Sequence, residues 1–155
     1  MIKGKISDNN EPLISLKLKG ATRSHKVLAI IDTGFNGYLA VPRNIIMGQG
    51  WQLIGSEKYE VATGKLEVFD VFLGEIEWGK KSKSVYAMVT DSQDILIGTK
   101  LLKDSTLIIN FPAKKVRITE DFELTLKLYR DGWKVVYTPY IQAPSECVST
   151  LKRLV

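Results

Sequence analysis

One short segment of this 155-residue chain combines residue types that can do acid–base chemistry, Asp32-Thr33-Gly34. The triplet follows an apolar run over residues 27–31, which predicts a buried strand that delivers a carboxylate to its end. Burying a carboxylate without partners is costly, so this position favours a functional role for Asp32. The competing interpretation makes Asp32 an ordinary turn residue, with Gly34 supplying a positive φ angle. The tripeptide alone is a weak signal, so the surrounding sequence has to decide between these two interpretations.

A second segment, much later in the chain, follows the same order of apolar strand and glycine. Residues 95–97 are Ile-Leu-Ile, and Gly98 comes directly after them. Residues 99–103 then predict a short helix. Taken alone, this pattern indicates only a strand that ends in a turn.

Short apolar and alternating segments predict that strands must position both motifs. Segments 58–62 and 65–78 flank Thr63-Gly64 and predict a hairpin. A helical turn or two is expected over 42–47, with Pro42 at its first position. Many short strands with regularly spaced turns indicate an all-β barrel or sandwich. The other expected strands are 13–19, 26–31, 38–41, 84–90, 94–98, 106–111 and 115–119.

Together the two motifs resemble those of the retropepsin-like (clan AA) aspartic proteases of the prokaryotic single-domain type. That family holds its catalytic carboxylate in a hydrophobic-hydrophobic-Asp-Thr/Ser-Gly motif, here residues 30–34. A later hydrophobic-hydrophobic-Gly motif, here residues 96–98, packs under the active-site loop. The hairpin tip at 62–65 falls between them, where the family has its flap. The resemblance covers about residues 12–119 and implies an all-β closed barrel with a flap hairpin and one short helix.

The resemblance also implies which residues form the site. The catalytic triplet would be Asp32, Thr33 and Gly34, with Thr33 hydrogen-bonding across an interface to a second chain. No cofactor and no metal ion would be needed. The substrate would contact the flap tip, the second motif and the residue after the triplet: Phe35, Ala62, Thr63, Gly64, Ile97 and Gly98.

The chemistry of this family requires two carboxylates that share one proton, because neighbouring like charges cannot both ionise easily. The chain has one Asp-Thr-Gly triplet and no Asp-Ser-Gly triplet, so it supplies one such carboxylate. The sequence therefore predicts a symmetric homodimer with Asp32 of each chain at the two-fold axis. The expected activity is that of an aspartic endopeptidase, in which a water activated by the Asp32 pair hydrolyses peptide bonds in extended polypeptide segments.

Phe35 departs from the family pattern, which usually has Ala, Ser or Thr after the triplet. A bulky ring at this position narrows the cleft or shapes an apolar subsite. It motivates a second hypothesis, a non-proteolytic retropepsin-like module that holds a peptide or protein without cutting it. The two hypotheses differ in whether the Asp32 carboxylates come close enough to share a proton.

A third hypothesis starts from charge. The chain carries 22 basic and 17 acidic residues, a net charge of +5. A basic β-barrel with exposed aromatic residues could bind nucleic acid, and its affinity would then fall steeply with salt. Lysines on exposed strand faces have a simpler explanation, because they keep strand edges soluble. We therefore rank nucleic-acid binding last.

Several site classes are excluded by composition. One cysteine, Cys147, and one histidine, His25, exclude an internal disulfide and a multi-histidine metal centre. Asp91 and Asp94 flank a Ser-Gln pair and are typical of a solvated turn, with a metal role as the alternative. No apolar run approaches the roughly 20 residues of a membrane span, and the first ten residues lack the apolar core of a signal peptide. We expect a cytoplasmic protein without a membrane partner.

The sequence divides into an expected protease domain over 1–119 and a C-terminal extension over 120–155. In the extension, segments 123–129 and 133–138 predict a hairpin, and residues 145–155 predict a short helix. A two-stranded hairpin is marginal alone, so the extension is expected to pack on the domain or on the dimer partner. The extension matches no segment of the retropepsin-like family. A role in recruiting a partner or occluding the cleft is the alternative.

Overall fold

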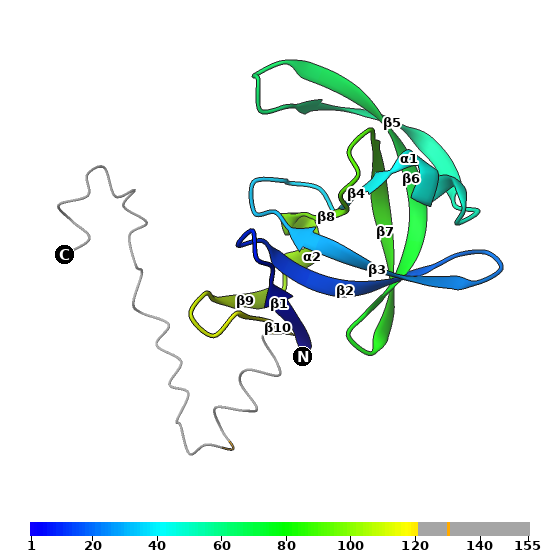
Figure 1. Cartoon of the computed structure of the whole chain (residues 1–155). Helices are drawn as coiled ribbons and strands as arrows, with labels where there is room; N and C mark the ends of the chain where they lie inside the picture. The colour runs from blue at the N-terminus through cyan, green and yellow to red at the C-terminus, as the bar shows by residue number, and fades with distance from the viewer. Residues whose placement is uncertain (121–129, 131–155) are drawn as a thin grey trace, which may run out of the picture. The chain divides into compact units, whose positions relative to one another are not determined.

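The computed structural model describes residues 1–120 and Arg130, and the expected elements of the extension lie outside these residues. The described chain forms ten strands and two short helices (Figure 1). The elements are β1 (Ile2–Ile6), β2 (Pro12–Lys19), β3 (Ser24–Ile31), β4 (Leu39–Pro42), α1 (Arg43–Met47), β5 (Gln52–Glu60), β6 (Leu66–Trp78), β7 (Lys81–Thr90), β8 (Leu96–Ile97), α2 (Thr99–Leu102), β9 (Ser105–Asn110) and β10 (Lys115–Glu120). No described helix has the length and apolar character needed to cross a membrane.

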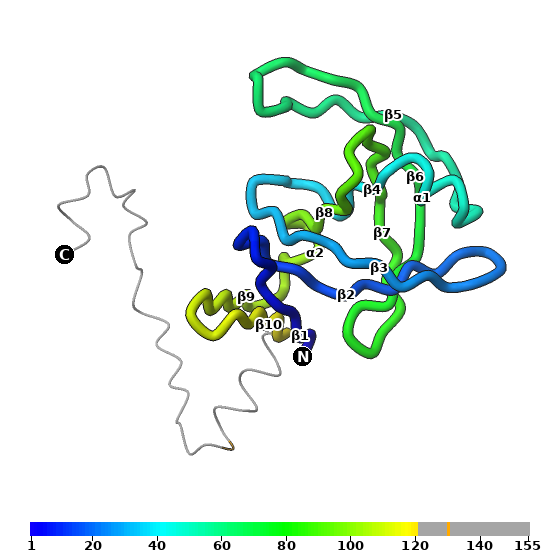
Figure 2. The backbone as a smooth tube through the Cα atoms, viewed as in Figure 1, coloured from blue at the N-terminus to red at the C-terminus, as the bar shows by residue number. Residues whose placement is uncertain are grey.

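All ten strands belong to one sheet, in the order β5-β6-β7-β4-β8-β3-β2-β1-β10-β9. An additional pairing of β6 with β2 bends this sheet back on itself (Figure 2). The all-β class is confirmed. Within the described residues, however, β5 and β9 each have one neighbour, so the sheet as a whole is not the closed barrel that we expected.

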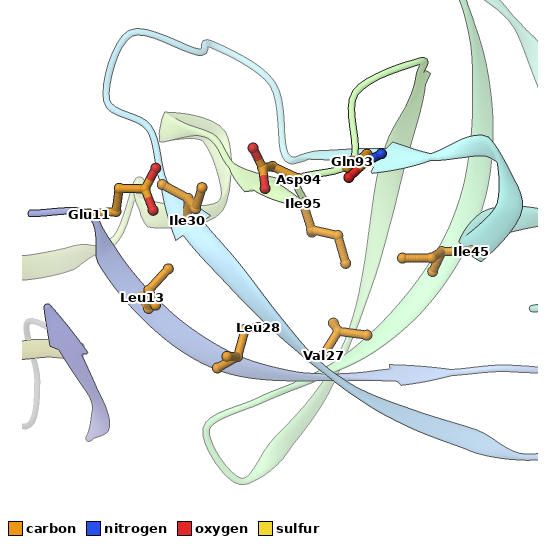
Figure 3. A pocket seen from close by; sticks show the side chains of 9 residues that line it. All are labelled: Glu11, Leu13, Val27, Leu28, Ile30, Ile45, Gln93, Asp94 and Ile95. Atoms are coloured by element: carbon orange, nitrogen blue, oxygen red, sulfur yellow. The ribbon is translucent and has the colours of Figure 1, made fainter. Parts of the chain in front are cut away.

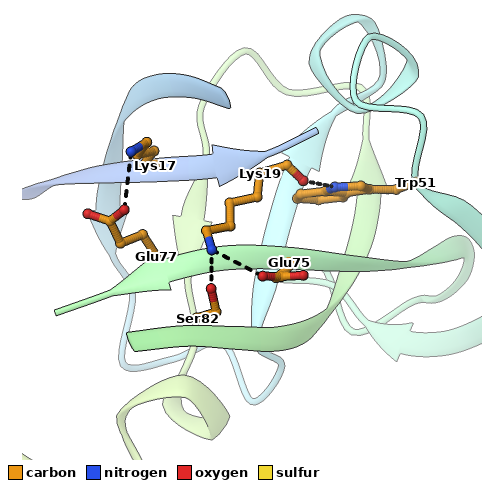
Figure 4. Close-up of polar contacts among 6 residues, drawn as sticks. All are labelled: Lys17, Lys19, Trp51, Glu75, Glu77 and Ser82. Carbon is orange, nitrogen blue, oxygen red and sulfur yellow. Dashed lines mark hydrogen bonds and ion pairs between the residues drawn. The ribbon is translucent and has the colours of Figure 1, made fainter. Parts of the chain in front are cut away.

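The contact between β2 and β6 is held mainly by apolar side chains. Leu18 lies opposite Ile76, and both side chains are fully buried. Two ion pairs flank them, Lys17 to Glu77 and Lys19 to Glu75, each with an N–O distance of 3.2 Å (Figure 4). Exposed pairs of this kind contribute at most about 1 kcal/mol each, whereas full burial of one Leu or Ile contributes roughly 1.5–3 kcal/mol.

Lys19 anchors a further contact through its main chain. The indole Nε1 of Trp51 donates a 2.8 Å hydrogen bond to the Lys19 carbonyl, and Lys19 Nζ also contacts Ser82 Oγ (Figure 4). Hydrogen bonds lower the pKa of the Glu75 carboxyl, and the bond with Ser82 contributes more than the bond with Lys19. The Trp51 hydrogen bond joins the residue just before β5 to the end of β2.

The core follows the alternation that predicted the strands. Ile14, Leu16 and Leu18 of β2 are buried, while Ser15 and Lys17 between them are exposed. On β3 the last residues alternate in the same way and bury Ala29 and Ile31. The inner faces of the other strands complete one cluster with these residues, which includes Leu39, Val41, Val85, Ala87, Ile97, Leu101, Val116 and Ile118.

Three local predictions need correction. The described chain has both short helices that the residue pattern predicted, α1 and α2, so the single helix implied by the resemblance is wrong. Pro42 is the N-cap of α1 and the last residue of β4, not the first helical residue. The strand β1 was not predicted, since Lys3, Gly4 and Lys5 give it little apolar character and it is defined by pairing with β2 and β10.

Candidate active site

The strand that carries Asp32 is held next to the second motif. β8 lies between β3 and β4, parallel to β3 and antiparallel to β4. Ile31 is paired with Ile97, and the Asp32 N–H donates a 2.9 Å hydrogen bond to the Ile97 carbonyl. Two motifs that are far apart in the sequence are therefore joined by backbone hydrogen bonds at the point where the carboxylate leaves the sheet.

The Asp32 side chain organises its own turn. The Gly34 N–H donates a 2.9 Å hydrogen bond to Asp32 Oδ1, and the Phe35 N–H donates to the Asp32 carbonyl at 3.2 Å. Asp32 is half-buried, whereas Thr33 and Gly34 are exposed. The turn interpretation is thus partly confirmed, but Gly34 is not among the residues with positive φ, so that part of it is wrong.

The exposure of the triplet matters for its chemistry. Within one chain, Thr33 and Gly34 are exposed, and the second oxygen of Asp32 has no hydrogen-bond partner among the described residues. The carboxylate and the Thr33 hydroxyl are consequently accessible to a second molecule. The loop is held by its backbone and is open on the side that a substrate or another chain would approach.

Gly98 packs tightly under the loop that follows Asp32. A Cβ added at Gly98 would overlap the Gly37 carbonyl and lie 2.7 Å from Phe35 Cδ1. Hydrogen bonds reinforce this contact, since the Gly98 N–H donates to Tyr38 O at 2.9 Å and the Thr99 N–H donates to Phe35 O at 2.8 Å. The absence of a side chain at Gly98 lets the loop rest directly on the start of α2.

Ile97 and Gly98 are both buried in the single chain, with Ile97 at 0% exposure. Their evident contribution is to position the loop, and direct contact with a substrate stays a prediction for them.

The hairpin expected to be the flap is present. Glu60 is paired with Leu66, and the turn between them closes through the Val61 N–H to Lys65 O bond at 2.9 Å. Gly64 adopts a φ of +79°, which a side chain would disfavour. The predicted contact residues at the tip, Ala62, Thr63 and Gly64, are all exposed. Figure 2 shows the tip extending above the loop after β3.

An aromatic chain connects this hairpin to the Asp32 loop. The ring centroid of Phe35 lies 6.0 Å from that of Tyr59 on β5, and Tyr59 lies 6.3 Å from Phe69 on β6. Such tilted ring pairs are within the favourable range for aromatic contacts. Phe35 therefore does contact a neighbour in the cleft region, and this neighbour belongs to the hairpin.

Tyr59 is a site residue that the sequence analysis missed. Burial, together with a 2.8 Å hydrogen bond to Glu57, raises the pKa of Tyr59 to about 12. Its hydroxyl therefore stays protonated and continues to donate to Glu57 across the neutral range. The only sequence signal was an aromatic residue among the charged residues Glu57, Lys58 and Glu60, which does not reveal that its partner is Phe35.

No group of three or more potential metal ligands occurs among the described side chains, and Asp91 and Asp94 are both exposed. The residues brought together at the site are thus one carboxylate, a hydroxyl, several glycines and an aromatic pair. This set can bind and polarise a carbonyl or a water through Asp32.

No protein-family model matches this sequence, and no curated protein matches it. Solved structures do match this chain. The chain is similar to a retropepsin-like aspartic protease from Rickettsia conorii, with a TM-score of 0.57 and 18% identity over 74% of this chain and 86% of that one. The retroviral protease-like domain of Ddi1 from Leishmania major also matches, with a TM-score of 0.43 and 13% identity over 70% and 88% of the two chains. From the first of these matches, together with the paired motifs and the hairpin, we conclude that the chain has the retropepsin-like fold.

Proposed function

We propose that the protein is a homodimeric aspartic endopeptidase. The observation that carries the proposal is the placement of Asp32, which leaves the sheet beside Ile97, stays half-exposed and lies in a loop held by the Gly34 N–H. The retropepsin-like fold makes this the position at which such enzymes hold a catalytic carboxylate. The exposed Thr33 is available to hydrogen-bond across an interface with a second copy.

The proposed reaction needs two Asp32 residues, one from each chain. At close separation the pair retains one proton, because both carboxylates cannot ionise easily. The ionised member takes a proton from a bound water, which attacks the peptide carbonyl carbon, while the protonated member donates to the carbonyl oxygen. Collapse of the tetrahedral intermediate breaks the C–N bond: the leaving amine takes the proton that one Asp32 removed from the water, and a hydroxyl of the intermediate returns a proton to the other Asp32.

The substrate in this proposal is an extended segment. The exposed hairpin tip would close over it, and backbone hydrogen bonds would hold it as an added strand. This mode favours unfolded or flexible polypeptides, because a peptide bond inside a folded domain cannot adopt the required geometry.

The test compares wild type with Asp32→Asn on an unstructured peptide library from about pH 4 to pH 7.5, the range in which a carboxylate pair can hold one proton. Cleavage by wild type, with a loss of at least a thousandfold in Asp32→Asn that remains folded, is the expected result. Equal cleavage by both proteins would contradict the proposal.

A second candidate, a peptide-binding module without hydrolysis, is favoured by one observation. The Phe35–Tyr59 contact ties the hairpin to the Asp32 loop within one chain. Peptide binding by a folded dimer that cleaves nothing at any pH would select this candidate.

A further inference from the structure

A pocket of about 410 Å³ lies where β2 and β3 meet α1 and the loop before β8 (Figure 3). Its floor is apolar and includes Leu13, Leu28 and Ile30, with Ile45 and Ile95 at its sides. Leu28 is 56% exposed, and Leu13 and Ile30 are half-buried. Leu13, Leu28 and Ile30 therefore present apolar surface to solvent, whereas Ile95 belongs to the core and Ile45 packs against it.

Two carboxylates border this floor. Glu11 and Asp94 both line the pocket, and Figure 3 shows Ile30 between them with both carboxylates on the side of the loop that follows β3. The Ser7 hydroxyl donates to Glu11 Oε2 at 3.4 Å, and the Asp94 N–H donates to Ser92 Oγ at 3.2 Å, which restrains the segments that carry them. None of the ion pairs in the described part of the chain includes either residue.

The pocket is adjacent to the Asp32 loop along the same strand. Side chains alternate along β3, so Leu28, Ile30 and Asp32 share one face while Ala29 and Ile31 point into the core. Two residues of a strand span about 7 Å, which places Asp32 roughly that far from Ile30. Residues i and i+2 of a bound extended peptide have the same spacing.

We propose that this pocket binds a long cationic side chain, lysine or arginine, of an extended peptide. The aliphatic stem packs on Leu13, Leu28 and Ile30, and the cation reaches the carboxylates of Glu11 and Asp94. Neither carboxylate has an ion-pair partner among the described residues, and both border an apolar floor, which suits a side chain with an aliphatic stem and a cationic end. As a statement about substrate selection, the inference rests on the proposed endopeptidase function.

The symmetry of the proposed dimer adds a consequence. Each chain contributes one pocket at the same distance from its own Asp32, so preferred substrates carry cationic residues on both sides of the cleaved bond at equal spacing. A single cationic residue would occupy only one pocket and bind more weakly.

The test is binding of labelled peptides to full-length Asp32→Asn, followed by fluorescence anisotropy. Lysine, norleucine or glutamate is placed in turn at each position of an otherwise constant extended peptide. Norleucine keeps the apolar stem and lacks the charge, so it separates the two parts of the pocket. We expect lysine to bind roughly fivefold more tightly than norleucine at one position or at a symmetric pair, and glutamate more weakly than either.

The matched variants use the same background. Glu11→Gln with Asp94→Asn should make lysine and norleucine equal, whereas Asp91→Asn, an exposed carboxylate of the same loop outside the pocket, should leave the preference unchanged. Equal binding of lysine and norleucine at every position, or a lysine preference that survives the double substitution, would overturn the inference.

The inference and the proposed function fail in different ways. Wild-type protein that cleaves peptides without regard to lysine refutes the pocket assignment alone. Protein that cleaves nothing, yet loses a lysine preference in binding when Glu11 and Asp94 are neutralised, refutes the endopeptidase and supports the pocket.

Discussion

Individual residues around Asp32 owe their importance to close packing rather than to charge. Gly37 and Gly98 both lie against the ring of Phe35, and a Cβ at Gly37 would lie 2.7 Å from Phe35 Cε2. Asp32 itself is fixed through its N–H and the Gly34 N–H. The position of the carboxylate therefore depends on neighbours that carry no functional group of their own.

This packing predicts the effect of a single methyl group. Gly98→Ala should lower the free energy of unfolding by about 1–3 kcal/mol, because the added atom overlaps the Gly37 carbonyl and the Phe35 ring. Urea unfolding measures the change. Gly48→Ala is the matched control, since its added Cβ meets only Ile45 O at 3.5 Å and should change stability little. A Gly98→Ala protein as stable as wild type would contradict the packing argument.

The two motifs that meet at this site could be recognised from their residues alone. Asp32 and Gly98 were recognised because each comes directly after an apolar strand, and the structure pairs those two strands. The contact of Tyr59 with Phe35 and the shared pocket of Glu11 and Asp94 were not recognised, because in each case the two residues come from different strands or loops. Such contacts depend on which strands pair and in which register, and a single sequence does not determine this.

At the scale of elements, the hairpin of β5 and β6 differs from the strands that it joins. Most of β5 is exposed, and large apolar residues such as Leu66 and Val68 on β6 face solvent. Within its outer half the ring of Tyr59 contacts that of Phe69, and Tyr59 also contacts the ring of Phe35 outside the hairpin. The hairpin is therefore an element with little core of its own and one aromatic attachment.

Removing that attachment should free the hairpin. Phe35→Ala should speed amide hydrogen exchange over residues 58–66 severalfold relative to wild type, because an aromatic pair contributes about 0.5–1.5 kcal/mol beyond its buried area. Exchange within β2 and β3 should change much less. Phe111→Ala, which truncates a 53% exposed ring elsewhere, is the control. Unchanged exchange in the hairpin would show that the ring contact does not restrain it.

Element prediction from sequence succeeded where apolar residues alternate, as in β2, and failed for β1. The sequence Ile-Lys-Gly-Lys-Ile has apolar residues only at its ends, and its strand conformation depends on two partners, β2 and β10. The bend that pairs β6 with β2 was equally unpredictable, because it depends on Leu18 and Ile76 meeting across a long separation in sequence.

At the scale of the whole molecule, the proposed dimer makes stability depend on concentration. A folded dimer in equilibrium with unfolded chains gains stability by mass action, so the thermal midpoint should rise between about 1 and 100 µM protein. Sedimentation should show the matching shift toward dimer. Thr33→Ala should weaken both effects, because the exposed hydroxyl is proposed to bridge the chains.

Ser15→Ala, which removes an exposed hydroxyl on β2, is the control and should keep the wild-type dependence. A midpoint independent of concentration, with one sedimenting species of monomer mass, would contradict the dimer while leaving the fold unaffected.

The position of β1 between β2 and β10 also determines the order of events during synthesis. Ile2 lies opposite Ile118, so a nascent chain exposes β1 long before β10 leaves the ribosome. At about 5–20 residues per second, several seconds pass before the pair can form. Partners so distant in sequence slow folding, and an unpaired strand invites association with other chains. Lys3 and Lys5 place charge on that strand during the delay, which protects the unfinished sheet from aggregation.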